Sequence, residues 1–154
     1  MGRAQTSVIV PGPRDEVFAL FADRENYRKL VGPIGGTLVK AGESARQGEG
    51  AIHKVGLGPF GISEQIVAID PGRGFTYRAV TPLPVRHYIG VVEFHDDPSG
   101  TRVDYTLDVQ AAVPLPAPIL KILVKGLAGG LARGATKELR RRGWPAGQRT
   151  QPRE

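Results

Sequence analysis

The feature that most constrains this chain is a long stretch in which apolar and polar residues alternate. In the segment TRVDYTLDVQAAV, residues 101–113, the odd positions from Val103 to Ala111 are apolar or aromatic and the even positions between them are polar. Such alternation is typical of a strand with one covered and one solvated face. Related patterns occur in segments 37–41, 50–55, 62–69, 75–80 and 85–95.

The connections between these segments are short and rich in turn-forming residues: GESARQGEG, GLGPFG, DPGRG, TPLP and DDPSG. They leave no room for crossover helices, so neighbouring strands are expected to be antiparallel. A short apolar run at 8–10 adds one strand before them. The sequence therefore predicts a meander of seven antiparallel strands.

Helical patterns flank the predicted sheet. Pro13 followed by Asp15 suits a helix N-terminus, and residues 26–30 predict a second short helix. After Pro116, residues 117–142 predict one long helix with leucines along one stripe. No other segment can cover the apolar face of the sheet, so the expected fold class is α+β, with a curved sheet wrapped around the C-terminal helix and a gap between them.

Length and composition narrow the class of protein. The chain has 154 residues, enough for one domain with a substantial core, and it has no cysteine. The missing cysteines exclude disulfides and thiolate chemistry and favour a reducing, cytoplasmic setting. The N-terminus does not resemble a signal peptide. The most apolar stretch, 118–132, is too short for a transmembrane segment.

The positive charge gathers at the C-terminus. Of the formal net charge of +6, residues 137–154 contribute six Lys/Arg and two Glu, which is +4, and the other 136 residues contribute +2. A charge confined to one end is unlike a nucleic-acid groove, so no specific nucleic acid is expected. We expect one domain over 1–142 and a flexible basic tail over 143–154, either solvated or anchoring RNA or anionic lipid.

The stretch GLGPFG, residues 56–61, has the G-x-G-x-x-G spacing of dinucleotide-binding loops. Such a loop follows a strand and opens a helix, whereas here a strand pattern, ISEQIVAID, comes next. Residues 56–61 therefore predict a hairpin turn and no nucleotide cofactor. We also expect no metal, since no His, Asp or Glu cluster has metal-ligand spacing and His87 and His95 fall on the solvated face.

Tight turns determine which residues face each other across neighbouring strands. The predicted opposite pairs are His53–Glu64, Val55–Ile62, Ile66–Tyr77, Ala68–Phe75, Tyr77–Tyr88, Val92–Tyr105 and Phe94–Val103. One face then gathers aromatic and aliphatic side chains around a few polar ones, which is typical of a small-molecule pocket. Its members are His53, Glu64, Ile66, Phe75, Tyr77, Tyr88, Gly90, Val92, Phe94, Val103, Tyr105, Leu107 and Val109.

Three phrases resemble the SRPBCC superfamily, the START-like or helix-grip proteins, in its polyketide cyclase/dehydrase-like branch. They are SVIVPGPRDEVFALFADRENY, ISEQIVAIDPGRGFTY and VEFHDDPSGTRVDYT, within a similarity covering about residues 5–142. The resemblance implies a helix-grip fold around a cavity. It also implies carriers or sensors of apolar molecules, or cyclases, and a gate loop at the cavity mouth formed by Leu57, Pro59 and Phe60.

Three functions remain open. The first is binding of a lipid-, polyketide- or aromatic-like molecule, by Phe75, Ile66, Tyr77, Tyr88, Val92, Phe94, Tyr105, Leu107, Leu127 and Leu131. The second is an aldol-type cyclase or dehydratase, in which His53 and Glu64 act as acid and base because the carboxylate raises the pKa of the imidazole. The third is an interaction protein with a vestigial cavity and a basic tail. His53 and Glu64 could instead be a buried pair that satisfies itself, or a pair near the open sheet edge in contact with water. The oligomeric state, monomer or homodimer, stays open.

Overall fold

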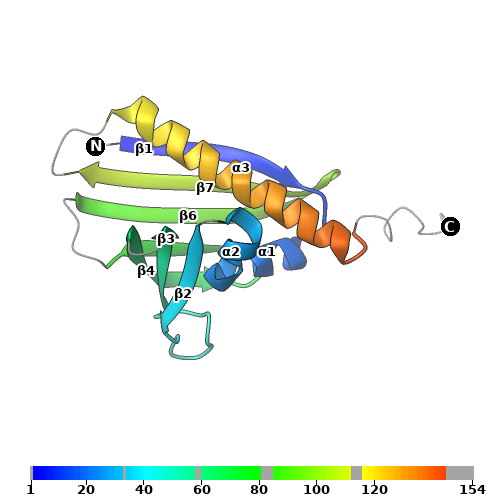
Figure 1. Cartoon of the computed structure of the whole chain (residues 1–154), viewed down its shortest axis with the longest axis horizontal. Helices are drawn as coiled ribbons and strands as arrows, with labels where there is room; N and C mark the ends of the chain where they lie inside the picture. Colours follow the sequence, from blue (N-terminus) through cyan, green and yellow to red (C-terminus); the bar gives the residue numbers. More distant parts are fainter. Residues whose placement is uncertain (1, 33, 58–59, 81–84, 112–115, 145–154) are drawn as a thin grey trace.

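The computed structural model describes residues 2–32, 34–57, 60–80, 85–111 and 116–144 (Figure 1). Within these residues, seven strands form one antiparallel sheet in the order β1-β7-β6-β5-β4-β3-β2. Their bounds are β1 (Gly2–Val10), β2 (Gly35–Lys40), β3 (Ile52–Leu57), β4 (Phe60–Asp70), β5 (Gly74–Ala79), β6 (Val85–Asp97) and β7 (Gly100–Ala111). The predicted meander is confirmed, with β1 closing back onto β7.

The helices lie against one face of this sheet. After β1 come α1 (Arg14–Ala22), the short 3-10 helix η1 (Arg24–Asn26) and α2 (Tyr27–Val31), and after β7 comes α3 (Ala117–Arg141). The long helix α3 runs along β1 and β7, and α1 and α2 lie beside its C-terminal half (Figure 1). The α+β helix-grip fold expected from the sequence is confirmed.

The inward stripe of α3 explains how the helix holds the sheet. Its buried residues recur at steps of three and four, and the apolar ones are Leu120, Val124, Ala128, Leu131, Ala132, Ala135 and Leu139. Burying a leucine such as Leu131 contributes about 2 kcal/mol. Gly134 lets α2 approach closely, since a Cβ there would lie 2.0 Å from the Leu30 carbonyl oxygen. Gly126, by contrast, has nothing within 4 Å of a Cβ.

The strand pairing differs from the prediction in three places. The first strand begins at Gly2 instead of residue 8, because it pairs with β7 from Gly2 to Val10. A bulge between Ile66 and Ala68 pairs Ala68 with Thr76, so the predicted Ala68–Phe75 pair is wrong. Tyr77 pairs with Gly90 and not with Tyr88, a two-residue shift that leaves the faces unchanged.

The other predicted pairs are found. The structure sets His53 opposite Glu64, Val55 opposite Ile62 and Ile66 opposite Tyr77. It also sets Val92 opposite Tyr105 and Phe94 opposite Val103. Gly56 pairs with Gly61 and Leu57 with Phe60, so residues 56–61 close a hairpin, as predicted.

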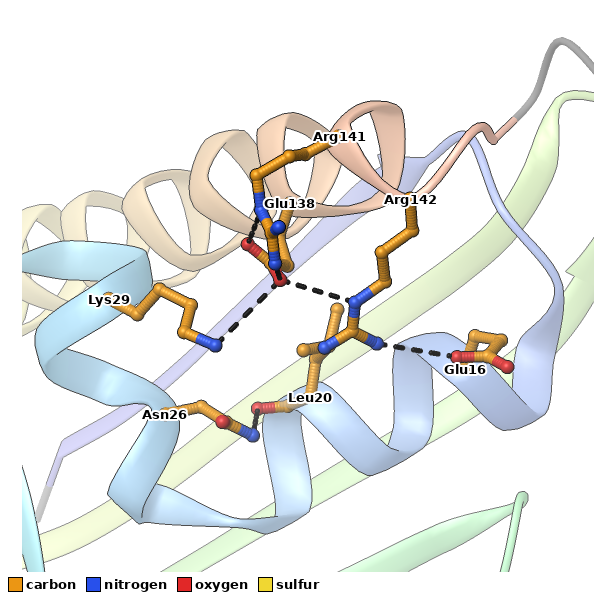
Figure 2. A network of polar contacts seen from close by, with 7 residues as sticks. All are labelled: Glu16, Leu20, Asn26, Lys29, Glu138, Arg141 and Arg142. Carbon is orange, nitrogen blue, oxygen red and sulfur yellow. Dashed lines mark hydrogen bonds and ion pairs between the residues drawn. The ribbon is translucent and has the colours of Figure 1, made fainter.

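A polar network ties the C-terminal end of α3 to α1 and α2 (Figure 2). Glu138 accepts hydrogen bonds from Arg141 at 2.5 Å and from Arg142 at 3.2 Å, and the Lys29 Nζ lies 3.7 Å from its Oε1. Arg142 also pairs with Glu16 at 3.5 Å. These contacts bind part of the C-terminal positive charge into the fold.

The first residues of the expected tail belong to this packed region. The Trp144 N–H donates to the Leu139 carbonyl at 2.8 Å, and its half-buried side chain packs against the core. Residues 145–154 lie outside the described part of the chain, so the expectation of a flexible tail over 143–154 stays a prediction for them.

Candidate ligand-binding cavity

A cavity of about 530 Å³ lies between the sheet and α3. Its volume falls within the range of small-molecule pockets. Its walls come from α2, from strands β3 to β7 and from the N-terminal half of α3. The lining residues are Tyr27, Ile34, Val55, Gly56, Ile62, Glu64, Tyr77, Tyr88, Tyr105, Leu107, Val109, Leu120, Leu123, Val124 and Leu127.

Tyrosine supplies most of the polar atoms in this wall. All four tyrosines of the chain line the cavity, although they come from α2, β5, β6 and β7. The Tyr77 and Tyr105 hydroxyls lie 3.5 Å apart, and the Tyr88 hydroxyl donates to the Glu64 Oε2 at 2.9 Å. Burial raises the pKa of Tyr77, Tyr88 and Tyr105, so these hydroxyls stay protonated and remain hydrogen-bond donors.

Tyr77 reaches the cavity because its partner across the sheet is Gly90. A Cβ on Gly90 would lie 2.0 Å from the Tyr77 Cζ, so the ring occupies the space where another side chain would stand. The phenol ring then lies with its centroid 6.2 Å from that of Phe75 and 6.4 Å from that of Tyr88. Glycine at position 90 therefore shapes the polar end of the cavity.

A fully buried arginine supports this polar end. Arg24, on η1, does not line the cavity, but its guanidinium lies 4.5 Å from the Tyr77 ring centroid and 5.1 Å from that of Phe75. Its Nε donates to the Tyr27 hydroxyl at 3.3 Å, and its Nη2 lies 3.5 Å from the Glu64 Oε1. Within the described residues, Nη1 and Nη2 have no hydrogen-bond partner.

The charge on Arg24 persists in this setting. Burial opposes the charge, but attraction to Tyr27 and Glu64 raises the pKa of the guanidinium overall. Aromatic faces also stabilise a desolvated cation. Arg24 was not among the predicted site residues, since a charged residue in the segment DREN suggests a solvated turn.

Glu64 is the one carboxylate in the described cavity wall. Burial raises its pKa, and the opposing effects of Arg24 and of the Tyr88 hydrogen bond do not cancel that rise. Both oxygens face protein partners, Oε1 towards Arg24 and Oε2 towards Tyr88. A carboxyl in such surroundings can accept a hydrogen bond when ionised and donate one when protonated.

His53 faces a different neighbour from the one expected. It lies opposite Glu64 in the sheet, but it is fully buried and does not line the cavity. Its Nε2 is 2.5 Å from the Gln47 Oε1, and the Gln47 amide nitrogen donates to Glu25 at 3.1 Å. Because an amide oxygen only accepts, this contact assigns the proton of neutral His53 to Nε2.

The expected rise in the pKa of His53 is wrong. Burial, followed by repulsion from Arg24, lowers the pKa to about 4. Within the described residues, Nδ1 has no partner and no hydrogen bond joins His53 to Glu64. The acid–base role of the pair stays a prediction, but the structure puts only Glu64 on the cavity wall.

The other predicted ligand-binding residues divide into two groups. Five of them line the cavity: Tyr77, Tyr88, Tyr105, Leu107 and Leu127. The other five are buried core side chains outside the lining: Ile66, Phe75, Val92, Phe94 and Leu131. They share the inward face of the sheet or helix with the lining residues, and alternation alone cannot tell the two groups apart.

Several lining residues were not predicted. Tyr27 and Ile34 come from the segment around α2, and Leu120, Leu123 and Val124 come from the first turns of α3. Tyr27 follows Arg24 by three residues, the spacing that places two side chains on one helical side, and this was the signal available in the sequence.

The hairpin expected to gate the cavity adjoins its wall. Val55, Gly56 and Ile62 line the cavity on both sides of the turn. Pro59 and the side chains of Leu57 and Phe60 lie outside the described residues, so the gate stays a prediction. In the described part of the chain, no group of His, Asp and Glu is arranged to hold a metal ion. No helix there is both long and apolar enough to cross a bilayer.

Comparison with known proteins identifies the family. The chain matches the family described as polyketide cyclase/dehydrase and lipid transport over residues 1–143. The chain belongs to this family. No curated protein sequence matches it.

Solved structures of this fold superpose on the protein at low identity. A START superfamily protein from Mycobacterium smegmatis has 14% identity and a TM-score of 0.72, covering 92% of this chain and 99% of that one. Ara h 8.0201 has 16% identity and a TM-score of 0.68, covering 88% and 95%. DynU16, from the dynemicin biosynthetic locus, has 18% identity and a TM-score of 0.66, covering 86% of this chain but 46% of its own. At these identities the comparison shows the fold.

Proposed function

We propose that this polyketide cyclase/dehydrase and lipid transport family member binds one uncharged, mainly apolar small molecule between its sheet and α3. The observation that carries the proposal is the cavity wall, in which apolar side chains surround Glu64 and four tyrosine hydroxyls. The apolar part favours an acyl chain or ring system. The polar end favours a hydroxyl or carbonyl group on the ligand.

The charges around the polar end argue for an uncharged ligand. Arg24 and Glu64 already form an ion pair of opposite charge at 3.5 Å. A charged ligand would add a further desolvated charge with no counterion in the described wall, which is costly in a cavity of low polarity. A neutral hydroxyl or ketone meets the same hydrogen-bonding groups without that cost.

Filling the cavity with a larger side chain tests the proposed binding site. Leu127→Trp adds a large side chain to the wall, whereas Val39→Trp makes the same class of change at an exposed position on β2. In titrations with a neutral fluorescent apolar dye, wild type and Val39→Trp are expected to bind, and Leu127→Trp to lose at least tenfold in affinity. Equal dye binding by all three would refute the cavity as the binding site. No binding by wild type would favour the interaction protein with a vestigial cavity.

One observation supports an enzyme as the second candidate. The pKa of Glu64 is raised inside an apolar cavity that also holds protonated tyrosine hydroxyls. Such a carboxylate can take a proton from carbon next to a ketone while the hydroxyls stabilise the enolate oxygen, as an aldol-type cyclase or dehydratase requires. In this second candidate function Glu64 transfers the proton, and His53 does not line the cavity.

Turnover separates the two candidates. If the protein is a cyclase or dehydratase, Glu64→Gln should abolish conversion of a linear poly-β-ketone thioester while dye binding persists. If the wild type binds the substrate analogue and returns it unchanged, as followed by mass spectrometry, the binding protein is the better description.

A further inference from the structure

The outward side of α3 is apolar near the start of the helix and basic towards its end. Its first turns expose Ile119, Ile122 and Leu123, with side chains 48%, 69% and 61% accessible. Further along, Arg133, Lys137 and Arg140 are exposed. Positions 122, 126, 129, 133, 137 and 140 follow one another at steps of three and four, so they lie on one side of the helix. We call this side the outer face of α3, apolar at one end and basic at the other.

The positive charges of this face are not balanced within the protein. In the described residues, no ion pair involves Arg133, Lys137 or Arg140, and none involves the exposed Lys121 or Lys125 of the apolar end. The only acidic residue of α3 is Glu138, which is buried and already occupied by Arg141, Arg142 and Lys29. The outer face thus presents free cations to solvent.

Three of these cations surround one depression. A groove of about 390 Å³ between β1 and α3 is lined by Ile9, Ala132, Arg133, Thr136, Lys137 and Arg140. Guanidinium and ammonium groups gathered around a groove with an apolar floor suit a phosphate group attached to an apolar body.

The apolar end of the same face meets the cavity. Leu123 lines the cavity and is also 61% exposed, so the cavity reaches solvent beside it. Ile119 and Ile122 extend the apolar surface outward from this opening without lining the cavity. A molecule that enters or leaves next to Leu123 therefore passes the outer face of α3.

We propose that the outer face of α3 docks on an anionic lipid bilayer. The apolar end enters the boundary between head groups and acyl chains, and the basic end lies on lipid phosphates. Charge complementarity favours this occupant, and the exposed isoleucines at the cavity opening favour a bilayer over a nucleic acid. Docking brings the opening of the cavity against the membrane, so an apolar ligand can exchange without crossing water. This last step rests on the proposed binding function, while docking itself does not.

The test is co-sedimentation of the full chain with phosphatidylcholine vesicles, with and without phosphatidylglycerol. Wild type is expected to bind only the anionic vesicles, and binding should weaken as salt is raised. The triple variant Arg133→Gln, Lys137→Gln, Arg140→Gln should lower the partition coefficient about a hundredfold, since each cation near an anionic surface is worth roughly a factor of five. The matched control is Arg3→Gln, Lys54→Gln, Arg73→Gln, which removes the same charge from exposed positions outside α3 and should stay within about threefold of wild type.

A second pair of substitutions tests the apolar end. Ile119→Ser with Ile122→Ser leaves the cavity lining intact and should weaken vesicle binding at least tenfold, with the residual binding more sensitive to salt. Equal binding to both vesicle types, unchanged binding by the triple variant, or binding of RNA in place of vesicles would each overturn the proposal. Dye binding without vesicles reports on the cavity separately, so docking and ligand binding can fail independently.

Discussion

Glu64 and Glu138 are exposed to nearly the same small extent, 7% and 6%, yet their pKa values shift in opposite directions. Burial raises the pKa of Glu64, whose nearest cation lies 3.5 Å away among aromatic rings. Hydrogen bonds from Arg141 lead the effects that lower the pKa of Glu138 to about 2, and Arg142 and Lys29 add to them. Burial outweighs the partners of Glu64, whereas the donors and counterions of Glu138 outweigh its burial, so equal exposure does not give equal pKa shifts.

This difference separates Glu64, in the candidate site, from Glu138, which holds two helices together. Glu138 joins α3 to α2 with cations that reach it from solvent, since the Arg141 and Lys29 side chains are 69% and 52% exposed (Figure 2). The partners of Glu64 do not offset its burial, so its pKa stays raised. It also lines a cavity, which is where functional carboxyls are found. Substitutions at each carboxylate and at its partners test this difference.

Loss of the buried cation should have the largest effect. Arg24→Met leaves Glu64 buried without a counterion and is expected to reduce the free energy of unfolding by about 3–5 kcal/mol. Urea denaturation at neutral pH measures the loss. The exposed Arg28→Met on α2 is the matched control and should change stability by less than about 0.5 kcal/mol. Adding Glu64→Gln to Arg24→Met should restore part of the loss, and a double variant no better than the single one would contradict the pairing.

His53 extends the comparison to a buried base beside the same cation. Its pKa falls from 6.5 to about 4 in the folded protein, chiefly through burial, so the unfolded chain takes up the proton first on acidification. The contribution of His53 to the free energy of unfolding should therefore be fully present above about pH 6.5. It should decline by roughly 2–3 kcal/mol towards pH 4.

Unfolding curves of wild type and His53→Gln at several pH values isolate this contribution. His53→Gln should lose most of the decline between pH 6.5 and 4, whereas His87→Gln, which changes an exposed histidine on β6, should keep it. If both variants follow the wild-type curve, His53 does not carry the pH dependence.

These residues show how far the sequence could be interpreted. Alternation gave the inward-facing residues of β3 to β7, and the hairpin at 56–61 gave the His53–Glu64 register because a tight turn leaves few pairings. It could not reveal the bulge between Ile66 and Ala68, since no glycine or proline marks it. It also could not separate Leu107, in the cavity wall, from Val92, in the core.

The burial of Arg24 was beyond local analysis for a physical reason. A short helix of charged residues usually lies in water, and only tertiary contacts with Phe75 and Tyr77 of β5 make this position a cation site. The pKa of His53 was therefore expected to rise, whereas burial first and Arg24 second lower it. Its desolvation and its repulsion from Arg24 both depend on residues distant in sequence.

Neutralising each carboxylate in turn tests the central comparison directly. Glu138→Gln should lower the thermal midpoint at neutral pH, because the lowered pKa of Glu138 stabilises the fold above about pH 4.5, and the difference should vanish as pH falls through about 2. Glu64→Gln should leave the midpoint unchanged or higher, because a raised pKa means that ionising Glu64 already costs the folded state. Equal losses in both variants at neutral pH would show that the two carboxylates play one role.

The smallest effect should come from the hydroxyl that holds Glu64. Tyr88→Phe removes the 2.9 Å hydrogen bond and is expected to cost about 1 kcal/mol and raise the pKa of Glu64 further. Tyr77→Phe removes only a 3.5 Å contact with another hydroxyl, so it should cost less and leave the carboxyl nearly unchanged. Carbon-detected NMR titration of the Glu64 carboxyl compares the two variants in one experiment. A larger pKa change in Tyr77→Phe than in Tyr88→Phe would mean that the ring cluster around Arg24, and not the Tyr88 hydrogen bond, tunes the carboxyl.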